Sequence, residues 1–292
     1  MEKALRVLGW GLFVLSLAAG VGFEANAAES APQRVISMSP NFTEIIYDIG
    51  AQDQLIGVTD FCKFPPEAKT KAKVGGFFNP NFEAIVSLKP DLVLLVPFYG
   101  QTIQSFKKLG IPILIQDDSS LQNVLDTYDV FGKALGRERQ AKAAKKKLQD
   151  QLDAVRKKAG RRHAVSILFV VGHNVGEIDR VYAASEHSFV GEIISLSGGQ
   201  NVLSGTSIAF PLVSKEQLIK RDPEVIVDCM PGDEATDDTI ARARVAWSRF
   251  PSLRAVRENH IYFLKQDEFT IPGPTMVGLA EYLSKIFDAV QK

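Results

Sequence analysis

The stretch that decides the fold reads Glu83-Ala-Ile-Val-Ser-Leu-Lys-Pro90-Asp-Leu-Val-Leu, and its pattern returns as Glu216-Gln-Leu-Ile-Lys-Arg-Asp-Pro223-Glu-Val-Ile-Val. In each copy a glutamate opens a short helical segment, a proline ends it, and an acid then leads into an apolar strand. A second pair of stretches, Glu44-Ile-Ile-Tyr-Asp-Ile-Gly50 and Glu192-Ile-Ile-Ser-Leu-Ser-Gly198, points to the same duplication. The sequence therefore predicts two similar α/β lobes, and a cleft between lobes is a common place for a small ligand to bind.

Short apolar strands alternate with helical segments in both halves of the chain. The expected strands are residues 34–39, 55–60, 92–96 and 111–116 in the first half, and 165–171, 181–185, 225–229 and 261–265 in the second. Such alternation is typical of βαβ units, which build mostly parallel sheets.

One long segment interrupts this alternation. Arg137 to Ala159 contains no Gly or Pro, and its apolar residues, among them Leu148 and Leu152, recur at helical spacing. We interpret it as a rigid helix that joins the lobes; an ordinary surface helix is the alternative. The predicted boundaries are 34–135 for the N-terminal lobe, 136–160 for the connecting helix and 161–292 for the C-terminal lobe.

The composition excludes some classes of function. With 292 residues, 46% of them hydrophobic, the chain can form two domains with real cores. Its 34 basic residues are balanced by 34 acidic ones, so it lacks the basic excess expected of a protein that binds nucleic acid or a membrane surface.

The N-terminus has the pattern of a secretory signal peptide. Lys3 and Arg6 precede the apolar run Leu8 to Val21, and Ala25-Asn-Ala27 fits the small-x-small cleavage pattern. A membrane anchor is the alternative, but the apolar run is shorter than the roughly 20 residues that span a bilayer. We predict that residues 1–27 are removed after Ala27 and that the mature protein is exported and soluble.

Motifs for catalysis or metal binding are missing from the sequence. There is no HExxH, no P-loop and no close pair among the four histidines. This counts against an enzyme, although only weakly, because a single sequence can hide a scattered site. Export permits a disulfide between Cys62 and Cys229, and two separate thiols are equally compatible with the sequence.

Several stretches resemble periplasmic binding proteins for cobalamin, haem and ferric siderophores. They are 34–44 (Arg-Val-Ile-Ser-Met-Ser-Pro-Asn-Phe-Thr-Glu), Val74-Gly-Gly76, 81–93 and Ser197-Gly-Gly-Gln-Asn-Val202, and they occur in the family's order over roughly 34–290. The cobalamin-binding members are the most similar. The resemblance implies a class III fold, in which one long helix joins two α/β lobes. It also implies delivery of the ligand, in the periplasm, to an ABC transporter permease driven by ATPase subunits.

The resemblance assigns a docking role to Glu83 and Glu216. In this family one surface glutamate per lobe contacts arginines of the permease, and these two residues lie in the repeated block that carries those glutamates. Two carboxylates would steer the protein onto a basic receptor. The alternative is a first-turn glutamate favoured by the helix dipole, and both roles can hold together.

We expect the ligand at the carboxyl ends of the strands, where ligands bind in open α/β sheets. The loops placed there are aromatic and poor in charge. Their candidate ligand-binding residues are Asp60, Phe61, Cys62, Phe77, Phe78, Phe98, Tyr99, His173 and Phe210. Core packing is the alternative for each of the aromatic residues.

A corrin suits these loops better than haem or a siderophore. Phe77 lies where cobalamin-binding members have a tryptophan and some haem-binding members an iron-binding tyrosine, and phenylalanine cannot bind iron. The loops have no arginine cluster for a strongly anionic siderophore. His173 is a candidate axial ligand of the chelated metal, with a hydrogen bond to the ligand's rim as the alternative. No protein-bound metal is expected.

The sequence thus predicts a monomeric carrier that binds a small-molecule metal chelate, with cobalamin as transported ligand and no required cofactor. Haem or a ferric siderophore is the alternative ligand. A rival of a different class is a cofactor-modifying enzyme or chelatase that uses the same cleft, with Cys62 or His173 as reactive group.

Overall fold

The computed structural model describes residues 31–76, 78–97, 100–160, 163–174, 178–230 and 235–291, without the side chain of Asp267. The predicted signal peptide, 1–27, lies outside the described residues. Residues 31–292 form one compact unit. In the described part of the chain, no helix combines the length and the apolar character needed to cross a membrane.

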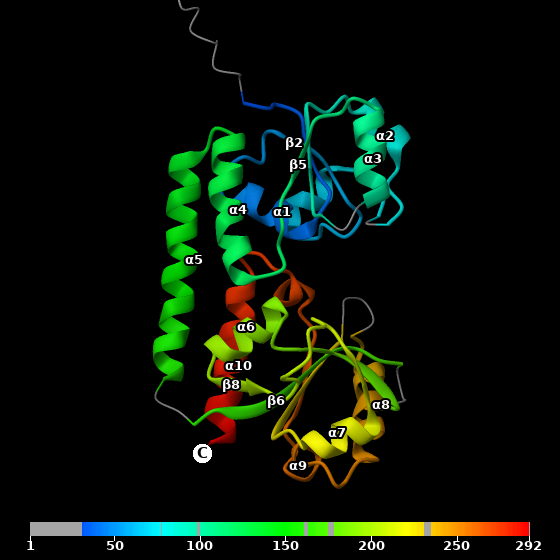
Figure 1. Cartoon of the computed structure of the whole chain (residues 1–292), viewed down its shortest axis with the longest axis vertical. Helices are drawn as coiled ribbons and strands as arrows, with labels where there is room; N and C mark the ends of the chain where they lie inside the picture. The colour runs from blue at the N-terminus through cyan, green and yellow to red at the C-terminus, as the bar shows by residue number, and fades with distance from the viewer. Residues whose placement is uncertain are drawn as a thin grey trace, which may run out of the picture. The chain divides into compact units, whose positions relative to one another are not determined.

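The first half of the chain, coloured from blue to cyan-green in Figure 1, forms a parallel sheet with the strand order β3-β2-β1-β4-β5. Its strands are β1 (Val35–Ser37), β2 (Leu55–Val58), β3 (Ala72–Lys73), β4 (Leu92–Leu95) and β5 (Ile113–Ile115). Its helices are α1 (Pro40–Asp48), the 3-10 helix η1 (Pro66–Thr70), α2 (Phe82–Ser87) and α3 (Gly100–Lys108). The central strands β1 and β4 are buried throughout, as expected of apolar runs covered on both faces.

The second half forms a mixed sheet with the order β11-β10-β6-β7-β9, in which β8 also pairs with β6. Its strands are β6 (Val165–Gly172), β7 (Arg180–Ala184), β8 (Gly199–Asn201), β9 (Leu212–Ser214), β10 (Val225–Cys229) and β11 (Ile261–Leu264). Its helices are α6 (Phe189–Leu196), α7 (Lys215–Arg221), α8 (Asp237–Ser248), α9 (Arg254–Arg257), the 3-10 helix η3 (Asp267–Thr270) and α10 (Met276–Val290). The pairings of β6 with β8 and of β10 with β6 and β11 are parallel, as predicted.

The antiparallel strand β7 departs from the simple βαβ pattern. It pairs antiparallel with both β6 and β9. The connection from β6 to β7 is too short for the crossover that a parallel return needs, so the chain turns back beside the strand it has left. The sheet of the second half is therefore parallel in most of its pairings but not in all.

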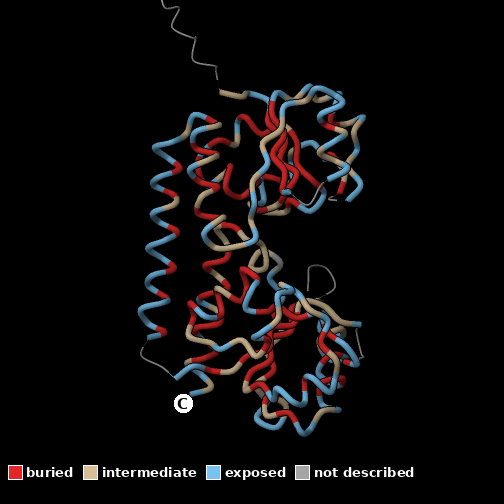
Figure 2. Tube along the Cα trace, viewed as in Figure 1, coloured by how far each residue is buried: buried red, intermediate tan, exposed pale blue. Residues whose placement is uncertain are grey.

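Two helices join the halves, α4 (Leu121–Ala134) and the long helix α5 (Glu138–Ala159). Helix α5 lies where the connecting helix is predicted and contacts α4, α6 and α10. One stripe of it is buried, and the rest faces solvent (Figure 2). A Cβ at Gly132 would lie 2.5 Å from that of Ala141, so glycine permits the close approach of α4 to α5.

The two copies of the repeated block fold in the same way. Asn81 caps α2 by accepting a hydrogen bond from the Ala84 amide, and Ser214 caps α7 in the same manner. Each helix ends with a residue of left-handed backbone conformation just before the proline: Lys89, with φ 47°, and Asp222, with φ 39°. The duplication inferred from sequence thus extends to the backbone.

The acid after each proline also has the same role in both copies. Asp91 accepts hydrogen bonds from the amides of Gln33 and Arg34, at 2.7 and 2.9 Å, and Arg34 directly precedes β1. Glu224 accepts from the amide of Ser166 in β6 at 2.8 Å. In each half this carboxylate ties the strand that follows the repeat to the neighbouring central strand.

The second repeated pair forms reciprocal contacts between the halves. Glu44 of α1 accepts a hydrogen bond from the Thr275 hydroxyl at 2.8 Å, just before α10. Glu192 of α6 accepts from the amide of Leu121 at 2.8 Å, at the start of α4. Each glutamate thus contacts the amino end of a helix that is distant in sequence, α10 for Glu44 and α4 for Glu192. Backbone amides at such an end lack partners within the helix.

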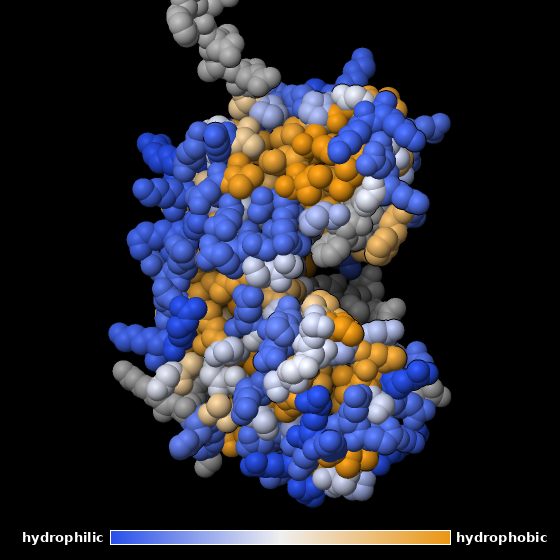
Figure 3. All heavy atoms as spheres, in the orientation of Figure 1, coloured by the Kyte–Doolittle hydropathy of each residue, from blue (hydrophilic) through white to orange (hydrophobic). Residues whose placement is uncertain are grey.

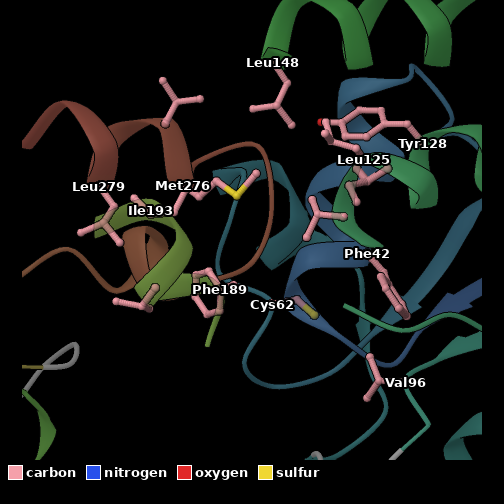
Figure 4. Packing of buried hydrophobic residues seen from close by; sticks show 14 of the residues in the cluster. Phe42, Cys62, Val96, Leu125, Tyr128, Leu148, Phe189, Ile193, Met276 and Leu279 are labelled. Atoms are coloured by element: carbon pink, nitrogen blue, oxygen red, sulfur yellow. The ribbon is translucent and has the colours of Figure 1, made fainter. Parts of the chain in front are cut away.

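A hydrophobic core runs through both halves. One cluster includes Phe42 of α1, Leu148 of α5, Phe189 of α6 and Met276 of α10. Figure 4 shows side chains of this cluster close to one another. A second, smaller cluster, which includes Trp247, lies within the second half.

Candidate functional site

Two loops of the first half lie together at the carboxyl edge of its sheet. Asp60 and Phe61 follow β2, and the Asp60 amide donates to the Gly75 carbonyl, after β3, at 3.0 Å. A Cβ at Gly76 would lie 3.4 Å from the Phe61 ring, so the two loops approach closely. Phe61 is 57% exposed and Phe78 is 91% exposed. These two phenylalanines therefore present apolar surface, as the sequence predicts for ligand contacts.

Cys62 lies beneath this surface. Its side chain is fully buried, and its sulfur lies 3.2 Å from the Thr43 hydroxyl and 3.1 Å from that of Thr59. Burial raises the pKa of the Cys62 thiol, although both threonines and Lys73 act to lower it. Its sulfur belongs to the buried cluster of Figure 4. Contact with a ligand would require movement of the loop, so this role stays a prediction.

Neither cysteine forms a disulfide. Cys62 and Cys229 are both buried thiols. Of the two alternatives that the sequence left open, the structure has the separate thiols.

Ser39, Asn41 and Asp118 form a polar cluster at the same edge that the sequence did not predict. Ser39 donates to Asn41 at 2.5 Å, and the Asn41 amide donates to Asp118, beyond β5, at 2.9 Å. Asn41 is almost fully buried. Burial and the neighbouring Asp117 raise the pKa of Asp118 to about 6, against the lowering effect of its hydrogen bonds. Only the order of the strands brings Asn41 and Asp118 together, because they are far apart in sequence.

His173 follows β6 and is held in a buried network. Its Nε2 lies 2.9 Å from Asp228 Oδ2, and its Nδ1 lies 2.9 Å from the Asn174 carbonyl oxygen. Trp247 Nε1 donates to the same carboxylate at 2.8 Å. The His173 side chain is only 3% exposed. Both ring nitrogens thus have partners, and axial ligation of a metal would require one of these bonds to break.

The charge state of His173 follows from these contacts. Burial acts to lower the pKa of His173, but the hydrogen bond and charge of Asp228, together with the Asn174 carbonyl, outweigh it and raise this pKa above its ordinary value. An imidazolium satisfies both acceptors because each ring nitrogen then donates. A protonated imidazole has no lone pair for a metal, so the axial role stays a prediction that this geometry does not favour.

Phe210 lies beside the end of β7. It precedes β9, and the Ser185 amide, after β7, donates to the carbonyl of the adjacent Ala209 at 2.9 Å. Because β7 is antiparallel to β6, this position is beside the carboxyl end of β7 and not beside that of β6, where His173 lies. The role of Phe210 in ligand binding stays a prediction. Phe210 is 41% exposed and remains available for contact.

Phe77, Phe98 and Tyr99 lie outside the described residues. Figure 3 shows the molecular surface hollowed between the two halves of the chain. Within the described ranges, no group of three or more His, Cys, Asp or Glu side chains is arranged to hold a metal ion.

Two cavities lie elsewhere, along the connecting helices. One of about 960 Å³ is bordered by α5, α6 and β8, and another of about 890 Å³ by α4 and α5. Arg156 and Glu192 line both. None of the predicted ligand-binding residues lines either cavity, so these hollows do not form the predicted site.

Glu83 and Glu216 occupy equivalent exposed positions. Each is the second residue of its helix, α2 or α7. Glu216 accepts a hydrogen bond from the Ser214 hydroxyl at 2.7 Å, and this bond, the helical amide and Lys215 lower the pKa of Glu216. Both carboxylates can face a partner, whereas their docking role itself stays a prediction.

A family model and individual relatives both match this chain to periplasmic binding proteins. A family model described as periplasmic binding protein matches residues 35–268. The vitamin B12-binding protein of Yersinia pestis (strain Pestoides F) is 30% identical over 223 residues, which cover 74% of this chain and 77% of that protein.

Solved structures share the fold. The periplasmic vitamin B12 binding protein BtuF of Vibrio cholerae superposes with a TM-score of 0.77 at 22% identity, covering 90% of this chain and 99% of that one. The periplasmic heme-binding protein RhuT from Roseiflexus sp. RS-1 superposes with a TM-score of 0.75 at 23% identity, covering 89% and 99%. At these identities the likeness establishes the two-lobed architecture and not the ligand.

Proposed function

The chain belongs to the family of periplasmic binding proteins, and we propose that it captures cobalamin, or a related corrinoid, and delivers it to an ABC importer. The observation that carries this proposal is the pair Phe61 and Phe78, two exposed rings on adjacent loops. A corrin is a bulky macrocycle with apolar faces, and aromatic rings bind such faces well. The curated relatives named for vitamin B12 binding support the same choice.

Haem is the second candidate ligand. The structural likeness to a heme-binding protein favours it, since the same fold accommodates a flat metal chelate. Against it, the described residues of the predicted site offer no free metal-binding nitrogen or sulfur, because His173 and Cys62 are buried and hydrogen-bonded. A carrier of either kind returns its ligand unchanged, whereas the rival enzyme would convert it.

An absorption titration tests the choice of ligand. Purified mature protein is titrated with cyanocobalamin and, separately, with haemin, and the released ligand is analysed by mass. We expect saturation at one equivalent of cobalamin, which is recovered unaltered. Stoichiometric binding of haemin without cobalamin binding would support the alternative, and a modified corrin would support the enzyme.

Variants at the aromatic pair test the site. Phe61→Ala and Phe78→Ala should each weaken cobalamin binding about fivefold to tenfold, because each removes apolar contact with the macrocycle. Leu109→Ala is the matched control, since Leu109 is also exposed, at 49%, but lies after α3, outside the predicted site. Equal affinities for all three variants would place the ligand elsewhere.

Docking and export complete the proposal. Glu83→Arg with Glu216→Arg should abolish stimulation of the importer's ATPase while leaving cobalamin affinity intact, because both side chains project from exposed helix starts. A collapse of affinity would instead place these residues in the ligand site. The mature periplasmic protein should begin at Ala28 and be monomeric, which intact-mass analysis and light scattering can check.

A further inference from the structure

The residue one turn after each docking glutamate is an exposed, β-branched apolar residue. Val86 lies three positions after Glu83 and is 47% exposed; Ile219 lies three positions after Glu216 and is 46% exposed. Residues at this spacing are neighbours on a helix surface. Each half of the chain therefore presents a carboxylate next to a bare aliphatic side chain.

The pattern is specific to one face of each helix. The residue before Val86, Ile85, and the residue before Ile219, Leu218, are both buried in their cores. The helices thus use one apolar residue for the core and keep the next in solvent. Other equivalent positions differ, since Phe82 and Ser87 of α2 correspond to Lys215 and Lys220 of α7. What the two helices share is the glutamate, the core residue and the exposed aliphatic residue.

We propose that Val86 and Ile219 are contact residues of the surface that docks on the permease, each seated in an apolar recess beside the basic group that receives the neighbouring glutamate. The inference rests on the proposed docking of Glu83 and Glu216 and adds two residues to it. The pairing of the residues selects this occupant. One exposed carboxylate beside one exposed aliphatic side chain in each half suits a protein partner that offers a basic group and an apolar recess at two places.

The two kinds of residue contribute differently to the complex. Exposed charges act over a distance and raise the association rate, whereas buried apolar contacts slow dissociation. Valine and isoleucine are restricted at χ1, so little side-chain freedom is lost when they are buried in an interface. We therefore expect the glutamates to govern encounter and the aliphatic residues to govern the lifetime of the complex.

Binding kinetics test this division. The cobalamin-loaded protein is passed over the permease–ATPase complex in lipid nanodiscs, at low and high salt. Val86→Ser and Ile219→Ser should each weaken binding about fivefold, and the double variant about 25-fold, through faster dissociation at both salt concentrations. Glu83→Gln with Glu216→Gln should slow association and reduce its salt dependence.

Matched controls separate the inference from the docking proposal. Leu109→Ser and Val245→Ser remove other exposed aliphatic side chains, which are 49% and 59% exposed. Neither variant should change the association rate or the dissociation rate of the complex with the permease. Thermal melting and cobalamin affinity should be unaltered in all variants. If the glutamine variants weaken docking but the Val86 and Ile219 variants behave like the controls, this inference is overturned while the docking proposal stands. If the glutamine variants have no effect, or the loaded protein does not bind, both are overturned.

Discussion

Two buried ionisable residues show what the sequence could not reveal at the scale of single residues. From the sequence, His173 is a candidate ligand-binding residue after a strand and Glu44 is the first residue of a repeated stretch, and neither pattern shows what surrounds these side chains. In the structure the first is enclosed by Asp228 and Trp247, and the second is fixed against Thr275. The partners come from distant elements, so the charge states of these side chains depend on tertiary contacts that local patterns do not encode.

Glu44 should make stability depend on pH. Burial raises the pKa of Glu44 from 4.5 to about 7; the hydrogen bonds from Thr275 act to lower it, and the charges of Glu268 and Asp48 to raise it. Between these two values the native state binds more protons than the unfolded chain, so stability falls as pH rises from about 4.5 to about 7. Above that range the buried, ionised carboxylate of Glu44 lowers the free energy of unfolding by its full amount, up to about 3 kcal/mol.

Glu44→Gln tests this expectation. The amide retains an acceptor for Thr275 and removes the charge. The variant should therefore have a higher free energy of unfolding than the native protein at pH 8 and the same free energy of unfolding near pH 4.5. Urea unfolding at the two pH values measures the difference. Glu281→Gln, at an exposed position of α10, is the control and should show no such trend. A variant that loses stability at pH 8 would mean that the ionised carboxylate is favourable where it lies.

At the scale of elements, the duplicated helix and turn were predictable because every signal in them is local. The caps Asn81 and Ser214, and the prolines at 90 and 223, act on their own neighbours. The antiparallel strand β7 was not predictable in the same way. Its orientation depends on the length of a connection and on pairing with β9, whose three residues carry little pattern of their own.

The left-handed turn between helix and strand should be strained where no compensating contact exists. Lys89 has φ 47°, a conformation that costs an L-residue about 1 kcal/mol and glycine almost nothing. Lys89→Gly should therefore raise the free energy of unfolding by about 0.5 to 1 kcal/mol, whereas Lys89→Ala should not. Chemical denaturation of the purified variants measures both.

The equivalent position in the second half supplies the contrast. Asp222 has φ 39°, but its carboxylate also accepts a hydrogen bond from the Arg254 amide at 2.6 Å. Asp222→Gly relieves the backbone and removes this bond, so it should not stabilise the protein. A gain at Asp222 as large as that at Lys89 would show that the side-chain bond contributes nothing.

The exposure of phenylalanines in the loops of the predicted site was predictable from the sequence, and the geometry around them only in part. Exposed phenylalanines after β2 and β3 follow from apolar residues placed in loops, where the strand has already ended. The burial of Cys62 did not follow, because Thr43, which contacts its sulfur, comes from a different element, α1. The position of Phe210 did not follow either, because it depends on the direction of β7, which was predicted as a strand but not as an antiparallel one.

On the scale of the whole molecule, the connecting helix is part of the core and not only a spacer. Leu148 and Leu152 of α5 are buried in the cluster that contains Phe42 from the first half and Phe189 from the second. The reciprocal contacts of Glu44 and Glu192 cross between the halves as well. Shared burial of this kind couples the stability of one half to that of the other.

We therefore expect the two halves to unfold together. Trp247, the single tryptophan after the predicted signal peptide, reports on the second half through its fluorescence. Cys62 reports on the first half through thiol labelling, in a Cys229→Ala background that leaves it as the only cysteine. Both probes should give one urea midpoint, because neither half keeps a complete core when the other unfolds.

Leu148→Ala tests the role of the helix in this coupling. Leu148 is 3% exposed, so truncation should cost about 2 to 4 kcal/mol and shift the Trp247 and Cys62 transitions by the same amount. Leu109→Ala, at a half-exposed position, should shift neither. If the two probes separate, or if Leu148→Ala moves only one of them, then α5 joins two independently stable lobes. The core they share would then contribute too little free energy to bind them into one cooperative unit.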